Sequence, residues 1–365
     1  MRSGVPVRIS SQLTYIPGVI ILVLTLLVFY TSLVAFRKPS YTSAPQTQQH
    51  DSHWKGWANI DTIFSFGDSY TATGFNLNQK QPCPEDPFGN PTYDPISPYL
   101  KWIHYLTMTY NDSKVETYNF AVQGATVDQT LINRGSAFST QEGEKFLPNY
   151  DGQGNQTVGG DNDIAVGKRK NRNSSSKSGP LATWAPETTL FSVWFGINDI
   201  VFSNRSEALF DRIFESYSRT LDQLHTAGAR NFLLLNVPPI HRGPNQPNDS
   251  SLPKSIPSWN ARLAALATIF GSMNPETSVF LYDTYGLFNK ILDGPEDFEQ
   301  TRHLGNLRDQ CDKYVKKLAS QEMYERECGL PYDQYFWRDG LHVTFPVHRV
   351  LAERVAGLLR GWQSR

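Results

Sequence analysis

Residues Phe64–Asn76 read FSFGDSYTATGFN, and this stretch decides the fold prediction. A short apolar strand, Thr62–Phe66, runs directly into Gly67, Asp68 and Ser69. Gly67 permits a tight turn, and a polar residue at the carboxyl end of a buried parallel strand lies where open α/β sheets bind their ligands. Ser69 is therefore a candidate nucleophile, although an isolated G-D-S is more typical of the N-cap of a helix. No G-x-S-x-G motif is present, which excludes the common α/β-hydrolase elbow.

Beyond residue 59, short apolar stretches alternate with longer amphipathic ones. This alternation predicts an α/β fold, in which helices flank a parallel sheet whose buried strands are brief and apolar. The predicted strands are Thr62–Phe66, Glu116–Ala121, Thr189–Phe195, Asn231–Val237 and Ser278–Tyr282. The predicted helices run from about Ser206 to Ala227, from a Ser258 cap to Ile269, and from about His348 to Trp362.

Near the other end of the chain stands the sequence Asp339-Gly340-Leu341-His342. A serine hydroxyl is a poor nucleophile until an imidazole removes its proton, and the imidazole needs a carboxylate that fixes its tautomer and stabilises its cation. Asp339 and His342 can supply both groups from one loop. The spacing D-x-x-H is frequent by chance, so it gains meaning only together with Ser69.

Two further motifs follow predicted strands. Asn198, in the sequence GIND, comes after Thr189–Phe195, and its side-chain amide can donate a hydrogen bond to a developing oxyanion. Gly124, in NFAVQGA, comes after Glu116–Ala121, and a glycine there lets a backbone N–H approach an oxyanion closely. Each motif taken alone is also typical of an ordinary turn.

Taken in the order Ser, Gly, Asn and Asp-x-x-His, these residues resemble the GDSL family of SGNH hydrolases over about residues 60–360. Longer phrases resemble the fungal acetylesterases of carbohydrate esterase family 16. They are FSFGDSYTATGFN, FGNP (88–91), NFAVQGATVD (119–128), LFSVWFGINDI (190–200), AGARNFLLLNVPPIHR (227–242) and FWRDGLHVTFPVH (336–348). The resemblance implies a three-layer α/β/α sandwich with a mainly parallel five-stranded sheet, and neither a metal nor another cofactor.

The resemblance also assigns roles to individual residues. Ser69 is the expected nucleophile, His342 the general base and then acid, and Asp339 its orienting partner. Asp199 is expected to accept a hydrogen bond behind the reacting groups. The expected oxyanion hole has three donors: the backbone N–H of Ser69, the backbone N–H of Gly124 and the amide of Asn198.

The sequence departs from the family pattern at two positions. Val343 stands where the family usually has a proline after the histidine, and this change is expected to loosen the loop. Arg338 separates Trp337 from Asp339 and is expected to alter access or charge at the mouth of the pocket. Aromatic residues that flank the motifs can stack on a sugar ring or simply pack around the sheet edge. These residues are Tyr70, Phe75, Trp194 and Trp337.

The expected reaction is a two-step acyl transfer, with acetylated carbohydrate as the substrate. Two alternatives remain at this stage. One is a lipase or phospholipase-like esterase of the same family, and the other is a non-catalytic glycan-binding wall protein. The formal net charge is −1, from 34 Lys and Arg against 35 Asp and Glu, and this balance argues against nucleic acid as a partner.

The first sixty residues predict a membrane segment. Residues 16–36 read IPGVIILVLTLLVFYTSLVAF without a charge, and roughly 20 apolar residues span a bilayer core. The expected organisation is a short cytosolic tail (1–15), a transmembrane signal anchor (16–36), a linker (37–59) and the esterase domain (60–365). The alternative is a cleaved signal peptide and a secreted protein.

Sequons and cysteines favour an extracellular or luminal body. In an oxidising compartment the favoured disulfide is Cys311–Cys328, with Cys83 free or paired between chains, and three unpaired thiols are the alternative. No C-x-x-C pair supports a zinc site. The predicted glycosylation sites are Asn111, Asn155, Asn173, Asn204 and Asn248.

Overall fold

The computed structural model describes residues 54–150, 182–245, 249–316 and 323–361. Its centre is a sheet of five parallel strands in the order β2-β1-β3-β4-β5, which confirms the predicted parallel sheet. Every residue of β1 is buried, as expected for the middle of a sheet covered on both faces. The strands are β1 (Thr62–Gly67), β2 (Glu116–Asn119), β3 (Thr189–Trp194), β4 (Asn231–Leu235) and β5 (Ser278–Tyr282).

Three strands end earlier than their apolar runs. Val237 shows the reason: it is fully buried, but its N–H donates to Oδ1 of Asn260 and its carbonyl accepts from Nδ2 of the same side chain. The apolar run therefore continues past β4 although the strand-to-strand ladder has ended. An apolar run predicts that its residues are buried, but it does not show whether a neighbouring strand or a side chain makes their backbone hydrogen bonds.

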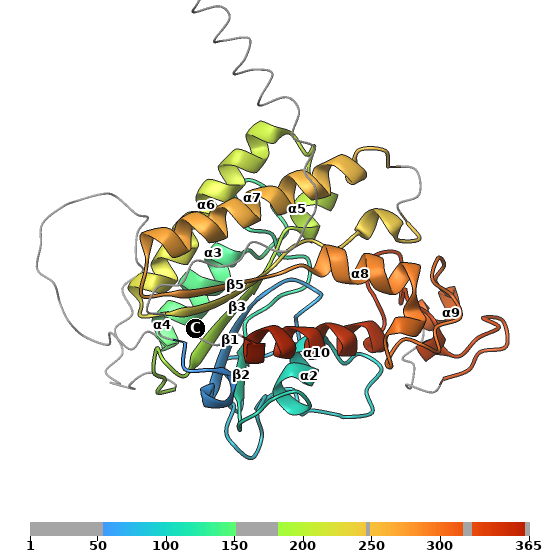
Figure 1. The fold of residues 1–365 in the computed structure, drawn as a ribbon, viewed down its shortest axis with the longest axis horizontal. Coiled ribbons are helices and arrows are strands. Elements are labelled where there is room, and N and C mark those ends of the chain that lie inside the picture. The colour runs from blue at the N-terminus through green and yellow to red at the C-terminus, as the bar shows by residue number, and fades with distance from the viewer. Residues whose placement is uncertain (1–53, 151–181, 246–248, 317–322, 362–365) are drawn as a thin grey trace, which may run out of the picture. The chain divides into compact units, whose positions relative to one another are not determined.

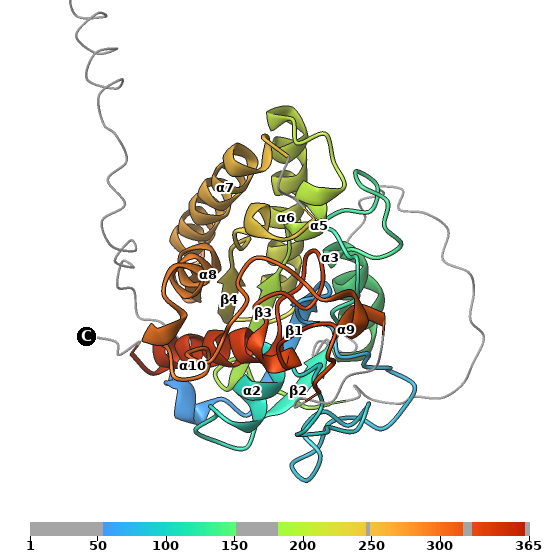
Figure 2. The same ribbon diagram turned by 90° about the vertical axis from the view of Figure 1, so that its right-hand side faces the viewer.

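Helices cover both faces of the sheet (Figures 1 and 2). The helices α2 (Trp102–Met108) and α10 (Phe345–Gly361) pack together on one face. The helices α6 (Glu207–Thr226) and α7 (Leu252–Met273) lie on the other face. The remaining helices are α3 (Phe138–Thr140), α4 (Leu147–Tyr150), α5 (Ile197–Val201), α8 (Thr284–Asp293) and α9 (Asp312–Lys316), with a π-helical segment at Gln141–Phe146.

The predicted start of α7 was wrong. Ser258 lies inside the helix rather than at its cap, and its hydroxyl donates to the carboxylate of Glu207. The helix begins at Leu252 and contains Pro257 in its second turn. Burial of Trp259 one turn further holds this end of the helix against the core.

Helix α6 behaves as its sequence predicts, with Ser206 accepting a hydrogen bond from the N–H of Leu209 at its start. Gly228 follows its end with a φ of 108°, in the region that favours glycine. The last helix, α10, begins at Phe345 rather than His348 and carries Pro346 in its first turn. His348 is consequently a buried residue within α10.

A disulfide joins Cys311 and Cys328. The two cysteines border a small second core of three tyrosines, Tyr314, Tyr332 and Tyr335, and this core contacts Phe345 at the start of α10. The disulfide therefore closes a peripheral segment on itself, and the tyrosine core of this segment packs against the helix that follows the Asp339–His342 loop. Cys83 is a free, partly exposed thiol.

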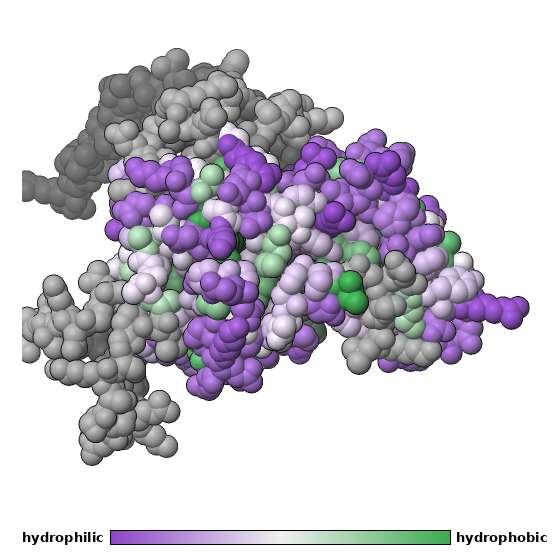
Figure 3. Space-filling model, turned by 90° about the horizontal axis from the view of Figure 1, so that it is seen from below, coloured by the Kyte–Doolittle hydropathy of each residue, from purple (hydrophilic) through white to green (hydrophobic). Residues whose placement is uncertain are grey.

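The helices of the described part of the chain include no membrane span. None of its helices combines the length and the apolar character needed to cross a bilayer. The predicted anchor, residues 16–36, lies outside the described residues, as do Asn155, Asn173 and Asn248. The face drawn in Figure 3 is mainly hydrophilic, with hydrophobic residues in small separate groups.

Candidate active site

The topology brings the predicted motifs to one edge of the sheet. In the strand order 2-1-3-4-5 the chain reverses direction of winding between β1 and β3, and ligands of such sheets bind at this switch point, beyond the carboxyl ends of the strands. Ser69 follows β1 and Asn198 follows β3, so both lie at the switch point. Gly67 pairs directly with Trp194 in the register of the two strands.

Ser69, His342 and Asp339 form a continuous hydrogen-bonded chain. Nε2 of His342 lies 2.7 Å from Oγ of Ser69. Nδ1 of His342 lies 2.8 Å and 3.0 Å from the two carboxylate oxygens of Asp339. With the proton on Nδ1, the imidazole donates to Asp339 and accepts from the Ser69 hydroxyl. This arrangement can remove the hydroxyl proton as the serine attacks an electrophile.

Asp339 is held as an anion. Burial acts to raise its pKa, but the hydrogen bonds and charge of His342 and the backbone N–H groups of His342 and Leu341 outweigh burial and lower the pKa to about 2. The same N–H groups donate to Oδ1 at 2.8 Å and 3.0 Å, and they fix the carboxylate beneath the ring. Asp339 therefore has the charge and the orientation that an imidazole partner requires.

The turn that carries Ser69 is fixed on both sides of the serine. Before it, the side-chain amide of Gln141 brackets Gly67, accepting from the Gly67 N–H at 2.9 Å and donating to its carbonyl at 2.8 Å. After it, the carboxylate of Asp68 accepts from the N–H of Tyr70 at 2.9 Å. These contacts preorganise the nucleophile on a short turn that leaves a rigid, buried strand.

Asn198 lies against both predicted oxyanion segments. Its Nδ2 donates to the Ala125 carbonyl at 2.9 Å and to Oδ2 of Asp68 at 3.2 Å. Ala125 adjoins Gly124 and Asp68 adjoins Ser69, so one amide links the two loops. Both of its hydrogens have acceptors in this structure, and donation to an oxyanion requires it to share or give up the longer contact with Asp68.

The two backbone donors of the predicted oxyanion hole are available. Within the described part of the chain, neither the N–H of Ser69 nor that of Gly124 has a hydrogen-bond acceptor. Gly124 has a φ of 77°, a conformation that favours glycine and that turns the backbone after β2. The role of these donors toward a developing negative charge stays a prediction.

Asp199 is a buried acceptor behind the site. Its Oδ1 accepts from the N–H of Val127 at 3.0 Å, and this bond holds the segment that contains Gly124 against α5. Its Oδ2 is buried without a partner among the described residues. Burial raises the pKa of Asp199 to about 7, despite the hydrogen bond from Val127.

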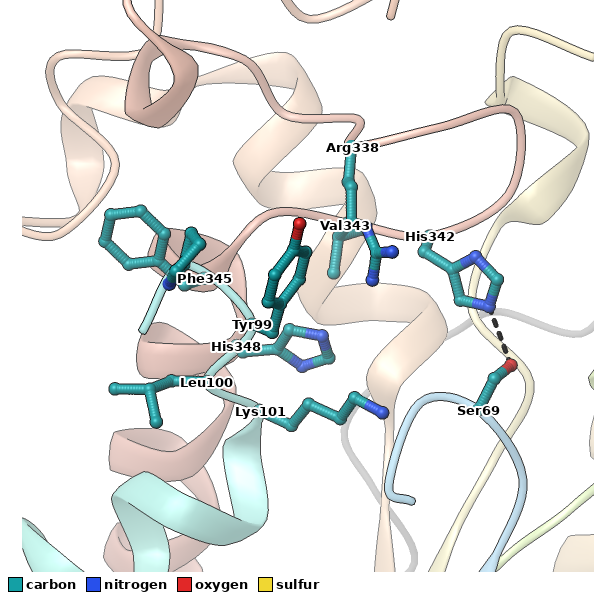
Figure 4. A pocket seen from close by; sticks show the side chains of 10 residues that line it. Ser69, Tyr99, Leu100, Lys101, Arg338, His342, Val343, Phe345 and His348 are labelled. Atoms are coloured by element: carbon teal, nitrogen blue, oxygen red, sulfur yellow. Dashed lines mark hydrogen bonds between the residues drawn. The ribbon is translucent and has the colours of Figure 1, made fainter. Parts of the chain in front are cut away.

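A pocket opens beside the serine and the histidine (Figure 4). The empty space in and in front of it is about 260 Å³, a figure that includes the solvent at its open side, so the enclosed part is much smaller. Two cations, Lys101 and Arg338, extend into it from different elements. The lining residues are Ser69, Pro98, Tyr99, Leu100, Lys101, Arg338, His342, Val343, Phe345 and His348.

Of the two roles left open for the flanking aromatics, packing around the sheet edge holds for three of the four. Tyr70 is 1% exposed, Trp194 0% and Trp337 1%, so none of these three rings can meet a ligand. They pack the sheet edge instead, and the Tyr70 ring lies against Trp194 and His342. Phe75 is partly buried against the core.

The loop from Trp337 to Val343 is closed by backbone bonds that do not use the Val343 N–H. Arg338 N–H donates to the His342 carbonyl at 2.8 Å, and Thr344 N–H donates to the Phe336 carbonyl at 2.9 Å. Valine and proline therefore both suit position 343. The expected loosening of this loop finds no support in the pattern of its hydrogen bonds.

Sequence reasoning missed Gln141, Lys101 and His348. Gln141 reaches Gly67 across 74 positions, and nothing in its local sequence marks this contact. Lys101 lies just before α2 and His348 lies within α10, far from the motifs in sequence. Asp68 was visible in the G-D-S motif, but its contacts with Tyr70 and Asn198 could not be read from it.

The residues at the sheet edge have the geometry typical of a serine hydrolase, with a serine, a histidine and an aspartate in one hydrogen-bonded chain. Among the described residues no three potential ligands gather in a metal-binding group. A family model described as GDSL-like lipase/acylhydrolase matches residues 63–355. The chain belongs to this family and is a carboxylic ester hydrolase.

The chain is also similar to individual known proteins. The chain is 32% identical over 247 residues to an acetylesterase of Thermothelomyces thermophilus, covering 65% of this chain and 74% of the relative. It is 24% identical over 315 residues to the thermolabile hemolysin of Vibrio parahaemolyticus, covering 81% and 63%. An acetylxylan esterase mutant from Geobacillus stearothermophilus aligns over 83% of this chain and 95% of its own, with 11% identity and a TM-score of 0.42.

Proposed function

We propose that this esterase removes small acyl groups, chiefly acetyl, from carbohydrates through an acyl-enzyme on Ser69. The observation that carries the proposal is the hydrogen-bonded chain from Ser69 through His342 to Asp339. The 32% identity to an acetylesterase supports acetyl as the acyl group. The resemblance of the quoted motifs to carbohydrate esterases supports a sugar as the alcohol.

The first step forms the acyl-enzyme. As Oγ of Ser69 attacks the ester carbonyl, Nε2 of His342 accepts the hydroxyl proton, and the resulting imidazolium is stabilised by Asp339. Negative charge develops on the carbonyl oxygen, where the N–H groups of Ser69 and Gly124 can donate hydrogen bonds. The C–O bond to the sugar then breaks, and the sugar oxygen leaves with the proton from His342.

The second step releases the acid. His342 removes a proton from a water molecule, whose oxygen attacks the acyl carbon and displaces Oγ of Ser69. The proton returns to Oγ and regenerates the enzyme, so that ester and water yield alcohol and carboxylic acid. No redox partner enters this cycle.

A substrate panel tests the proposal. Acetate release is measured from acetylated mono-, oligo- and polysaccharides, alongside 4-nitrophenyl esters of increasing chain length. We expect turnover of acetylated sugars and a fall in kcat/KM as the acyl chain lengthens. Preference for long acyl chains would favour the lipase-like alternative, and glycan binding without turnover of any acetyl ester would favour a non-catalytic wall protein.

We further propose that residues 16–36 anchor this domain on the extracellular or luminal side of a membrane, or are cleaved to release it. The sequon at Asn204 is exposed in the structure, which supports its use. Asn111 is partly buried, and its Nδ2 donates to the Ser113 carbonyl at 2.7 Å. Sequencing the amino terminus of membrane and secreted fractions, with glycosidase treatment of both, decides between the two fates.

A further inference from the structure

The pocket beside the proposed nucleophile is strongly cationic. Figure 4 shows the side chains of Arg338 and Lys101 extending from opposite sides toward the space next to Ser69 and His342. Arg338 belongs to the loop that carries His342, whereas Lys101 immediately precedes α2. None of the described residues that line the pocket is acidic. Two converging cations without a lining carboxylate point to an anionic ligand.

The guanidinium of Arg338 lies against Tyr99 but donates no hydrogen bond to any described residue. Its guanidinium lies over the ring of Tyr99, 4.7 Å from the centroid, and this contact fixes its plane. Its Nε forms a long ion pair with Oδ2 of Asp339 at 3.9 Å, beyond hydrogen-bond distance, and its side chain remains 36% exposed. Among the described residues no acceptor takes a hydrogen bond from the guanidinium, so its planar donors are open to a ligand.

Lys101 is a mostly covered ammonium that donates to the Ala72 carbonyl, its one hydrogen-bond acceptor among the described residues. Burial and the charge of Arg338 lower its pKa to about 8, although the carboxylate of Asp68 acts in the opposite direction. At neutral pH both cations are therefore charged within one pocket. His348, which also lines the pocket, is 4% exposed, and its Nδ1 has no partner among the described residues. The pocket thus holds several polar groups that a ligand can satisfy.

We infer that Arg338 and Lys101 form a subsite for a carboxylate on the substrate, so that the preferred esters are acetylated acidic sugars. This inference rests on the proposed function. A carboxylate matches the planar fork of an arginine with two parallel hydrogen bonds. Because Ser69 lines the same pocket, the carboxylate and the ester belong to the same or adjacent sugar units.

A matched pair of substrates tests the subsite. Acetate release is measured from an acetylated glucuronic acid and from its neutral uronamide, and the ratio of the two kcat/KM values is compared between variants. The wild type should prefer the acid roughly tenfold, since a charged hydrogen bond is worth at least that factor. R338Q should bring the ratio near one, R338K should retain much of it, and K101M should lower it. The exposed residue Lys254 supplies the matched control K254Q, which should keep the wild-type ratio.

Binding without turnover separates this inference from the proposed function. Free glucuronate should inhibit hydrolysis of 4-nitrophenyl acetate competitively and more strongly than glucose, and R338Q should weaken that inhibition. If acetylated sugars are not cleaved but this difference persists, the sugar esterase proposal fails and the carboxylate subsite stands. Equal kcat/KM for acid and uronamide, or an unchanged ratio in R338Q, overturns the subsite. A stronger preference for an acetylated sugar phosphate than for the acid also overturns it, in favour of a phosphate site.

Discussion

The hydroxyl of Tyr70 donates a hydrogen bond to the backbone carbonyl of Leu341 at 2.5 Å, across 271 positions of the chain. Tyr70 follows Ser69, and Leu341 precedes His342, so this bond joins the two loops that carry the proposed nucleophile and base. The tyrosine is 1% exposed, and burial raises its pKa well above the ordinary value, which keeps the hydroxyl protonated as a donor. The 2.7 Å contact between Ser69 and His342 is thus braced by a second contact directly behind it.

Replacement of Tyr70 by phenylalanine tests this brace. Y70F leaves the Leu341 carbonyl without its donor, so the free energy of unfolding should fall by about 1–3 kcal/mol. The value of kcat/KM for 4-nitrophenyl acetate should fall at the same time because the two loops lose their link. Urea unfolding and steady-state kinetics on one preparation measure both effects.

Tyr217 provides the matched control. It is equally buried, but its hydroxyl has no hydrogen-bond partner among the described residues. Y217F should therefore be neutral or slightly stabilising and should leave kcat/KM unchanged. Equal losses of stability in Y70F and Y217F would show that the bond to Leu341 contributes nothing specific.

The carboxylate of Asp339 should matter for rate far more than for folding. D339N removes the charge that stabilises the imidazolium and permits the wrong tautomer of His342, and changes of this kind lower kcat roughly 10⁴-fold. The thermal unfolding midpoint should shift little by comparison. A variant that hydrolyses 4-nitrophenyl acetate within tenfold of the wild type would remove Asp339 from the proposed mechanism.

Substitutions at two glycines distinguish the cost of steric crowding from the cost of backbone strain, because both have a positive φ but only one is crowded. Gly196 has a φ of 120°, and a Cβ there would lie 2.4 Å from Nε1 of Trp259. Gly135 has a φ of 81° with open space around it. G196A should lower the free energy of unfolding by at least about 2 kcal/mol, and G135A by only about 1 kcal/mol. If chemical denaturation showed comparable losses in the free energy of unfolding for both variants, the close packing of Gly196 against Trp259 would be contradicted.

The buried carboxyl of Asp199 predicts a specific pH dependence of stability. Its pKa is raised from an ordinary 3.8 to about 7 by burial, so between these values the folded state holds a proton that the unfolded state has released. The stabilisation is complete below about pH 4 and is lost as the pH rises through about 7. D199N, which mimics the neutral form, should therefore gain stability relative to the wild type across this window, by up to about 1.4 kcal/mol per pH unit.

The exposed residue Asp222 supplies the control, because D222N should change stability by the same amount at every pH in the window. Unfolding free energies measured from pH 4 to pH 8 give the comparison. A difference between D199N and the wild type that stays flat over this range would contradict a proton on Asp199 in the folded state.

The sequence predicted the sheet well because buried parallel strands leave a direct signal, namely short apolar runs such as Thr189–Trp194. It predicted the edge at which Ser69 and Asn198 meet because parallel strands place their carboxyl ends together. The bounds were less accurate. The predicted start of α7 at Ser258 was wrong, because burial of Ile256 and Trp259 stabilises the helix on both sides of Pro257.

The parts of the site that the sequence did not predict depend on contacts between distant segments. Gln141 reaches Gly67 from a π-helical segment, and Lys101, just before α2, lines the same pocket as Arg338 from a distant loop of the chain. The direction of the aromatic side chains could not be predicted from the sequence for the same reason. Trp194 and Trp337 flank the motifs in sequence but point into the core, and no local pattern distinguishes that direction from an exposed one.

The most direct test of the account is covalent labelling of the nucleophile. The wild type, S69A and H342A are incubated with a fluorophosphonate, and the label is located by mass spectrometry of the digested protein. The account predicts a single label on Ser69, its absence in S69A and a strongly slowed reaction in H342A, with all three proteins showing the same circular dichroism. Label on another residue, or equal labelling of S69A and the wild type, would contradict it.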